Sequence, residues 1–137
     1  MKDEASASVL EEDLVSTNDI LTRYYQLANA GDWDKWCDLF AENVVMDEQL
    51  AGHVEGRESL REMMKGFPAL YARFANVPKR RIVEDRQAAV ISHISALTPE
   101  GASIEAEVCN YFQISDGEIS YFANFHDTAA FTAAASR

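Results

Sequence analysis

The sequence holds four side chains whose chemistry suits proton transfer within a small molecule: Tyr24, Glu48, His93 and Asn110. A carboxylate in an apolar pocket has a raised pKa and can move a proton between carbon atoms. A tyrosine hydroxyl or an amide can donate a hydrogen bond to the oxyanion that such a transfer creates. A histidine can act as acid or base near neutral pH.

Tyr24 lies on the apolar face of a helix that the sequence predicts from an N-cap at Ser16 to residues 30–31. Ile20, Tyr24 and Leu27 recur at helical spacing, so they share one face. A tyrosine hydroxyl on a buried face needs a hydrogen-bond partner. That partner is either the protein itself or a ligand.

Two adjacent carboxylates, Asp47 and Glu48, follow a short strand predicted over residues 44–46. Alternation places Glu48 on the same face as Val44 and Met46, and Asp47 on the opposite face. We therefore prefer Glu48 as the base and keep Asp47 as the alternative.

The other two polar groups lie in strands predicted over residues 88–97 and 103–114. His93 shares a strand face with Ile91 and Ser95. Asn110 lies on an otherwise apolar strand face, and burial of an amide without a partner costs free energy. Both residues are candidates for the pocket.

The order of the predicted elements indicates an α+β domain. Helices are predicted over 16–31, from Asp32 onward and over 57–67, and a meander of strands follows over 75–84, 88–97, 103–114 and 119–127. Helices followed by antiparallel strands favour a curved sheet that is covered on one face. We expect one domain over residues 16–131, with a flexible acidic tail at 1–15 and a second flexible tail at 132–137.

Composition excludes several classes of protein. The formal net charge of −11, from 23 acidic and 12 basic residues, disfavours nucleic-acid binding because such a surface repels phosphate. No apolar run approaches the roughly 20 residues that span a bilayer. The 2 cysteines form no CxxC pair, which favours a reduced cytoplasmic protein, and the 3 histidines show no metal-ligand spacing. We expect no metal and no cofactor.

Four motifs in order resemble the nuclear transport factor 2-like superfamily, in particular the SnoaL-like polyketide cyclases and the ketosteroid isomerases. The motifs are RYYQLANAGD at 23–32, FAENVVMDE at 40–48, GRE at 56–58 and NYFQISDGEI at 110–119. The resemblance covers about residues 17–131. It implies a cone-shaped fold with three helices on a strongly curved, mostly antiparallel sheet.

The resemblance also implies roles for the polar residues. Tyr24 matches the isomerase tyrosine that donates to the oxyanion, and Asn110 matches the second oxyanion donor within one residue. Counting from Phe40 aligns Glu48 with the isomerase base, whereas counting back from the GRE motif favours Asp47. Gln49 departs from the family, which commonly has proline there.

An epoxide hydrolase branch of the superfamily is disfavoured by the residues present. That branch needs an aspartate where Asn124 stands, and an arginine–aspartate pair where His93 and Ser95 stand. Asparagine cannot act as a base, so epoxide hydrolysis does not fit.

A second set of residues is expected to contact the substrate: Trp36, Phe40, Met63, Phe112, Phe122, Asn124 and His126. The last three depend on the register of the final hairpin. A two-residue turn at Asp116 and Gly117 pairs Asn110 with Ala123 and turns Asn124 away from it. A three-residue turn that includes Ser115 places Asn124 on the Asn110 face, and the resemblance favours this second register.

Under the three-residue turn, four residues form an apolar patch on the outer face of the sheet: Tyr111, Tyr121, Ala123 and Phe125. This patch predicts a homodimer. The preferred function is an isomerase, cyclase or dehydratase that acts on a small apolar molecule, cyclic or polyketide-like. The alternative is a binding or assembly module of the same fold, and an open cavity with converging polar groups would favour the enzyme.

Overall fold

A computed structural model of the chain describes the backbone of residues 4–135 and the side chains of residues 16–135. The helices are α1 (Glu4–Ala30), α2 (Trp33–Cys37), α3 (Arg57–Met64), the short 3-10 helix η1 (Phe67–Ala69) and α4 (Ala129–Ala135). The strands are β1 (Phe40–Glu48), β2 (Gly52–Glu55), β3 (Arg73–Glu84), β4 (Gln87–Leu97), β5 (Ser103–Ser115) and β6 (Glu118–Phe125). The predicted α+β architecture is confirmed.

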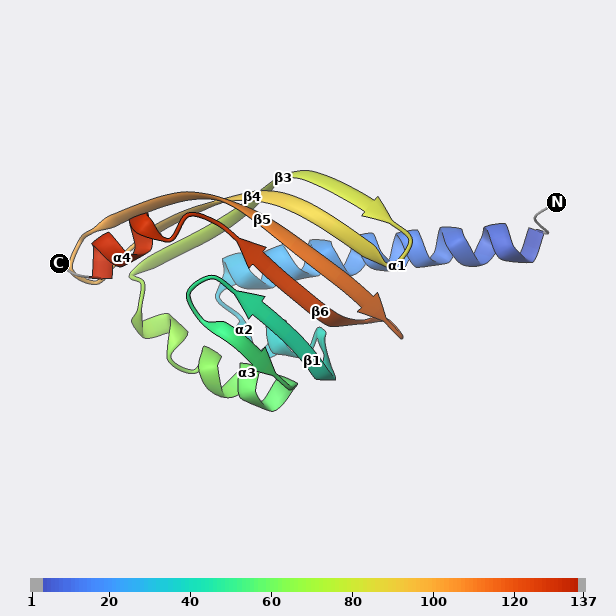
Figure 1. Ribbon diagram of the computed structural model, residues 1–137, viewed down its shortest axis with the longest axis horizontal. Coiled ribbons are helices and arrows are strands. Elements are labelled where there is room, and N and C mark those ends of the chain that lie inside the picture. Colours follow the sequence, from blue (N-terminus) through green and yellow to red (C-terminus); the bar gives the residue numbers. More distant parts are fainter. Residues whose placement is uncertain (1–3, 136–137) are drawn as a thin grey trace.

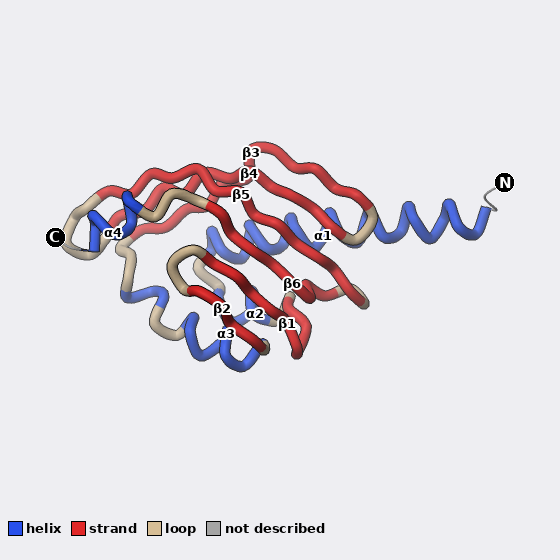
Figure 2. The backbone as a smooth tube through the Cα atoms, viewed as in Figure 1, coloured by secondary structure: helices blue, strands red, loops and turns tan. Residues whose placement is uncertain are grey.

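One strongly curved sheet of six strands forms the frame, in the order β2-β1-β6-β5-β4-β3. Neighbouring strands are antiparallel except β1 and β6, which are parallel. Figure 1 shows α2, α3 and the C-terminal part of α1 beneath the curved sheet, while the N-terminal part of α1 extends beyond it and α4 lies at the end of the sheet near the C-terminus. The tube in Figure 2 shows how few loop residues connect the long strands β3, β4 and β5.

The helix boundaries differ from the sequence prediction at both termini. Helix α1 begins at Glu4, so the predicted N-cap Ser16 lies inside the helix. Alanine, leucine and glutamate, which favour helices, are frequent in the segment predicted as an N-terminal tail. At the other end, residues 132–135 belong to α4 because Phe131 and Ala134 are buried against the sheet. Residues 1–3 and 136–137 of the two predicted tails lie outside the described part.

Residues 52–55, around His53, lie in none of the predicted helices and strands but form the edge strand β2. Helix α3 ends at Met64, before the predicted end at Phe67, and Pro68 lies in η1. A proline cannot donate the backbone hydrogen bond that would continue an α-helix.

The turn between β5 and β6 has two residues, Asp116 and Gly117, and Ser115 pairs with Glu118. Both turn residues have positive φ, 51° and 76°. This combination is typical of a type I′ hairpin turn. The three-residue turn that the resemblance favours is therefore wrong.

A bulge in β6 nevertheless restores the inward face that the three-residue turn predicted. The register shifts between Gln113 and Ile114, so that Ser120 is an additional residue in β6. Beyond the bulge Asn110 pairs with Asn124. The two asparagines thus share the concave face.

Candidate functional site

A cavity of about 480 Å³ lies between the concave face of the sheet and the helices. This volume falls within the range of about 300–1,000 Å³ that is typical of small-molecule sites. Most of the wall is apolar and is contributed by α1, α2, α3, the sheet and α4. The main apolar lining residues are Trp33, Trp36, Met46, Met63, Met64, Phe67, Phe74, Ile94, Val108, Phe122 and Phe131.

Glu48 and His126 form a hydrogen-bonded pair in this wall, with 2.7 Å between Glu48 Oε1 and His126 Nε2. Glu48 is the last residue of β1 and pairs with Asn124 of the parallel strand β6. His126 comes directly after β6, two residues beyond Asn124, and therefore lies near the same end of the sheet. The exposed fraction is 3% for the His126 side chain and 16% for the Glu48 side chain.

The partners of this pair fix where its protons lie. His126 Nδ1 is 3.0 Å from the carbonyl oxygen of Asp127, which only accepts, so Nδ1 carries a hydrogen. The other carboxylate oxygen, Glu48 Oε2, accepts the backbone N–H groups of Leu50 and Ala51 at 2.7 Å each. The remaining proton lies between Oε1 and Nε2, so the pair has no net charge whichever atom holds it.

The carboxylate keeps capacity for a substrate. A carboxylate offers about four lone-pair sites, and the pair with His126 and the two backbone N–H groups use three of them. One lone pair on Oε1 remains unused, and Glu48 lines the cavity. Glu48 can therefore accept a proton from a bound molecule while His126 stays in contact with it.

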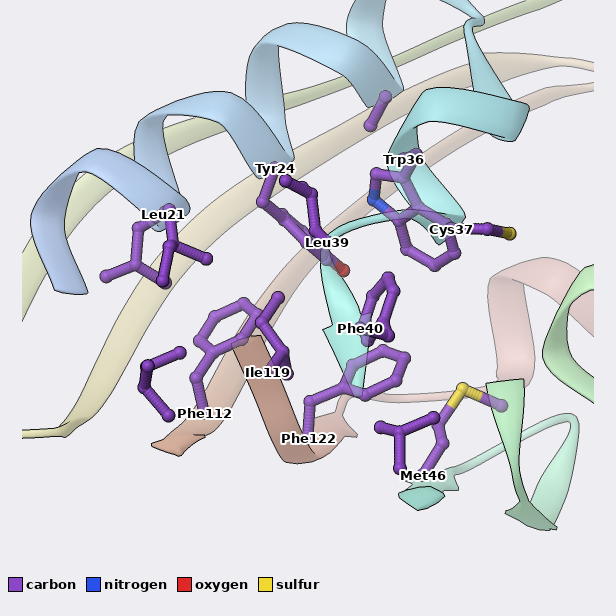
Figure 3. Packing of buried hydrophobic residues seen from close by; sticks show 14 of the residues in the cluster. Leu21, Tyr24, Trp36, Cys37, Leu39, Phe40, Met46, Phe112, Ile119 and Phe122 are labelled. Carbon is purple, nitrogen blue, oxygen red and sulfur yellow. The ribbon is translucent and has the colours of Figure 1, made fainter. Parts of the chain in front are cut away.

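Tyr24 extends from α1 into the aromatic core, and its ring is 4% exposed. It contacts Trp36 and Phe112 at centroid distances of 5.4 Å and 4.9 Å (Figure 3). Its hydroxyl makes no hydrogen bond to any residue in the described part of the chain, and Tyr24 lines the cavity. Burial raises the pKa of Tyr24 well above 10, with smaller contributions from Tyr25 and Glu48. The hydroxyl therefore stays protonated and is available as a donor.

Asn110 has a free hydrogen-bond acceptor, whereas the sequence predicts a free donor. Its amide nitrogen donates to the carbonyl oxygen of Val90 at 3.1 Å and to Ser92 Oγ at 2.8 Å. A backbone carbonyl only accepts, so the amide cannot be flipped. The prediction that Asn110 donates to an oxyanion is therefore wrong, because both N–H groups are occupied. Its buried Oδ1 atom has no partner among the described residues.

Asp47 faces away from the cavity, as strand alternation predicts. Its carboxylate contacts His53 Nδ1 at 2.7 Å and accepts the Tyr121 hydroxyl at 2.7 Å. The hydrogen bond from His53, followed by that from Tyr121, lowers the pKa of Asp47. The structure thus places Glu48, and not Asp47, in the pocket wall.

His93 also lies outside the cavity, contrary to the sequence prediction. Its ring contacts Glu105 Oε2 at 2.6 Å and Glu107 Oε1 at 3.0 Å on the convex face of the sheet. The concave face of β4 carries Ser92 and Ile94 instead. Strand alternation correctly placed His93 on the same face as Ile91 and Ser95, but this face is the convex, outer face of the sheet.

Five of the residues expected to contact substrate line the cavity: Trp36, Met63, Phe122, Asn124 and His126. Phe40 and Phe112 do not, because both are fully buried in the aromatic cluster around Tyr24 (Figure 3). Sequence reasoning missed Tyr71 and Asn76, which line the cavity from the segment before β3 and from β3 itself. Asn76 carried a signal, since an asparagine beside apolar strand positions needs a partner. Tyr71 belongs to no periodic segment and carried none.

The described residues form neither a metal site nor a membrane-spanning helix. No group of three or more histidine, cysteine, aspartate or glutamate side chains among the described residues is placed to hold a metal ion. No helix within residues 4–135 combines the length and the apolar character needed to cross a membrane. Cys37 and Cys109 are both free thiols.

Solved structures with the same fold are numerous but distant in sequence. A nuclear transport factor 2-like protein of unknown function from Burkholderia pseudomallei K96243 superimposes with a TM-score of 0.82 at 14% identity, covering 89% of this chain and 98% of the other. TerC, co-crystallised with polyporic acid, gives a TM-score of 0.79 at 14% identity, with coverages of 89% and 99%. A protein with a ketosteroid isomerase-like fold from Catenulispora acidiphila DSM 44928, in complex with trimethylamine, gives 0.75 at 12% identity, with coverages of 85% and 92%.

The sequence comparisons identify a family but no protein of known activity. No curated protein matches the chain. The family model of the SnoaL-like domain matches residues 21–122, which is most of the chain and contains Tyr24, Glu48 and Asn110. This protein is therefore a member of the SnoaL-like domain family with a nuclear transport factor 2-like fold.

Proposed function

We propose that this chain is a small-molecule enzyme that transfers a proton within an apolar, cyclic or polyketide-like ketone, by isomerisation, cyclisation or dehydration. The observation that carries the proposal is the Glu48–His126 pair, 2.7 Å apart, in the wall of an otherwise apolar cavity. An acid–base pair held on strand ends inside such a cavity is suited to proton transfer.

The proposed reaction uses the remaining lone pair of Glu48 as the base. Glu48 takes a proton from a carbon next to the substrate carbonyl, and the C–H electrons form the carbon–carbon double bond of an enolate. The Tyr24 hydroxyl donates to the enolate oxygen. The Glu48–His126 pair then returns the proton to a different carbon, or gives it to a leaving hydroxyl that departs as water. His126 thus takes the role of acid that the sequence assigned to His93.

The alternative, a non-catalytic binding or assembly module, is less well supported. Such a module has no need for a buried acid–base pair. The Tyr24 hydroxyl, which lines the cavity and bonds no described residue, supports a bound ligand in either case. The Glu48–His126 pair therefore favours the enzyme.

We further propose that the protein is a homodimer in a reducing, cytoplasmic setting, which suits its two free thiols. The convex face of the sheet carries an apolar patch formed by Ile91, Tyr111, Tyr121 and Phe125. Phe125 is 53% exposed and shares a cross-strand row with Ile91, with Cys109 of β5 between them. Exposed aromatic side chains that cluster on one face commonly mark an interface.

The test of the proposed activity begins with a substrate screen over cyclic enones and polyketide-like ketones, with turnover as the readout. Tyr24→Phe keeps the ring and removes only the donor, and we expect turnover to fall about 10²–10³-fold. Tyr111→Phe is the matched control, because its hydroxyl bonds Gln87 on the outer face. Wild-type turnover in Tyr24→Phe would refute the assignment of Tyr24, and absence of turnover across the whole screen would favour the binding module.

A further inference from the structure

Most of the buried polar atoms without partners in the described cavity wall are acceptors. Asn76, Asn110 and Asn124 all line the cavity, and each has a buried amide oxygen with no hydrogen bond among the described residues, whereas the indole N–H of Trp36 is the one donor in this group. Amide oxygens only accept hydrogen bonds. An apolar ketone has no hydrogen to give them, so the proposed substrate in its simplest form leaves these acceptors unsatisfied.

The polarity of Asn110 is fixed by the backbone. Its exposed fraction is 1%, and its amide nitrogen is held by the Val90 carbonyl and by Ser92. Only the oxygen is left for another group. That oxygen is left to accept from a bound molecule or from a neighbouring donor such as the Asn124 amide.

Asn124 is the direct partner of Asn110 across the strands, and Glu48 is the next residue in the same row. If the Asn124 amide turns to donate to Asn110, its own oxygen becomes the free acceptor. If it does not, the Asn110 oxygen remains free. In either arrangement the row presents a carbonyl oxygen, beside the acid–base pair.

The geometry points to a ligand that donates a hydrogen bond to this row: a neutral ring compound that carries a hydroxyl group in addition to its carbonyl. This inference deepens the proposed function, on which it rests for the identity of the site. Tyr24 donates to the carbonyl, and the Asn110–Asn124 row accepts from the hydroxyl. The two asparagines then determine which substrates fit, whereas Glu48 and His126 perform the reaction.

Hydroxyl and methyl groups of nearly equal size provide a clean test. We would measure the binding of hydroxytetralones and methyltetralones, substituted at the same ring positions, by isothermal titration calorimetry with the full chain. A cavity without a free acceptor prefers the methyl compound because the hydroxyl loses its water. With the acceptor, we expect at least one hydroxytetralone to bind about five- to tenfold more tightly than its methyl counterpart, because a hydrogen bond contributes about 1 kcal/mol net and 1.4 kcal/mol is tenfold.

Two variants test whether the Asn110–Asn124 row causes the preference for the hydroxyl compound. Asn124→Leu should reverse the order, so that the methyl compound binds more tightly. Asn110→Leu should do the same, and if it fails to fold Asn124→Leu still decides the question. Gln113→Leu is the matched control, since it removes an amide from the outer face of β5.

The outcomes separate this inference from the proposed function. Tighter binding of every methyl compound to the wild-type chain, or a hydroxyl preference that survives in Asn124→Leu, overturns the inference and leaves the enzyme proposal standing. A hydroxyl preference without turnover in any ketone screen supports the inference and contradicts the enzyme. Failure of all tetralones to bind overturns the inference together with the cavity as a binding site for such rings.

Discussion

Replacing Glu48 by glutamine should separate the stability of the site from its chemistry. Glutamine has the shape of glutamate, and its side-chain oxygen can accept the Leu50 and Ala51 N–H groups that now bond Oε2. Its amide nitrogen then faces His126 Nε2. Because the Asp127 carbonyl holds the hydrogen on Nδ1, Nε2 of the neutral ring accepts this new bond. Every hydrogen bond of the pair has a replacement, so the free energy of unfolding should fall by less than about 1 kcal/mol.

Alanine at the same position has no such replacement. Leu50 and Ala51 are exposed, so water can bond their N–H groups. The His126 side chain is 3% exposed and loses Glu48, its partner at Nε2. A buried acceptor without a partner costs about 1–3 kcal/mol, which is the loss of stability that we expect for Glu48→Ala.

Catalysis should respond differently from stability. Neither glutamine nor alanine can act as a base, so both variants should lose about 10²–10⁴-fold in turnover. Asp47→Asn, which changes the adjacent carboxylate on the outer face, is the control and should keep wild-type turnover. Urea unfolding followed by the fluorescence of Trp33 and Trp36 measures stability, and the ketone screen measures turnover.

Two results would refute this reasoning. If Glu48→Gln is destabilised as much as Glu48→Ala, the proton positions assigned to the pair are wrong. If Glu48→Gln keeps wild-type turnover, Glu48 is not the base. Calorimetric binding of the substrate to Glu48→Gln guards against a third explanation, loss of the pocket.

Three further predictions concern the frame of the site. Asn29 donates to and accepts from the backbone of Asn76, at 2.9 Å and 2.6 Å, and so ties α1 to β3; Asn29→Ala should lower the free energy of unfolding by about 1–3 kcal/mol in urea titrations. The pKa of His93 is raised above 6.5 by its carboxylate partners, so its contribution to stability is complete below pH 6.5 and is lost as the pH rises through the raised value. His93→Gln should remove that part of the pH dependence of Tm, and an unchanged pH profile would contradict it. Phe125→Lys should convert the proposed dimer to a monomer in light scattering, whereas a wild-type protein that is already monomeric would exclude the interface.

Local sequence patterns predicted the α+β class, the helices and the strand meander, and they placed several pocket residues on the inward face. Helical spacing put Tyr24 on an inward face, and strand alternation put Glu48 and Asp47 on opposite faces, as the structure has them. Alternation says which residues share a face but not which face is inward, and this is why His93 was misplaced. On β4 the inward positions carry small or apolar residues such as Ser92, and the polar His93 points outward.

Local sequence patterns could not predict the Glu48–His126 pair. Glu48 and His126 are far apart in the chain, and they meet because β1 pairs in parallel with β6. Their meeting depends also on the bulge at Ser120, which no propensity of that segment predicts. The polarity of Asn110 likewise depends on a bond to Val90, a partner from another strand. Long-range register, rather than residue type, decides these features.

The parallel pairing of β1 and β6 also explains how the site can be both rigid and uncharged overall. Glu48 ends one strand, His126 follows the other, and backbone N–H groups of the turn into β2 hold the free end of the carboxylate. Reactive groups supported in this way keep their geometry when a ligand arrives. Since the pair shares one proton, closing an apolar ligand over it buries no net charge, which would otherwise cost several kcal/mol. The donor on α1 and the acceptors on β5 and β6 then act on opposite ends of the ligand, and the order of binding among hydroxyl and methyl rings should report that arrangement directly.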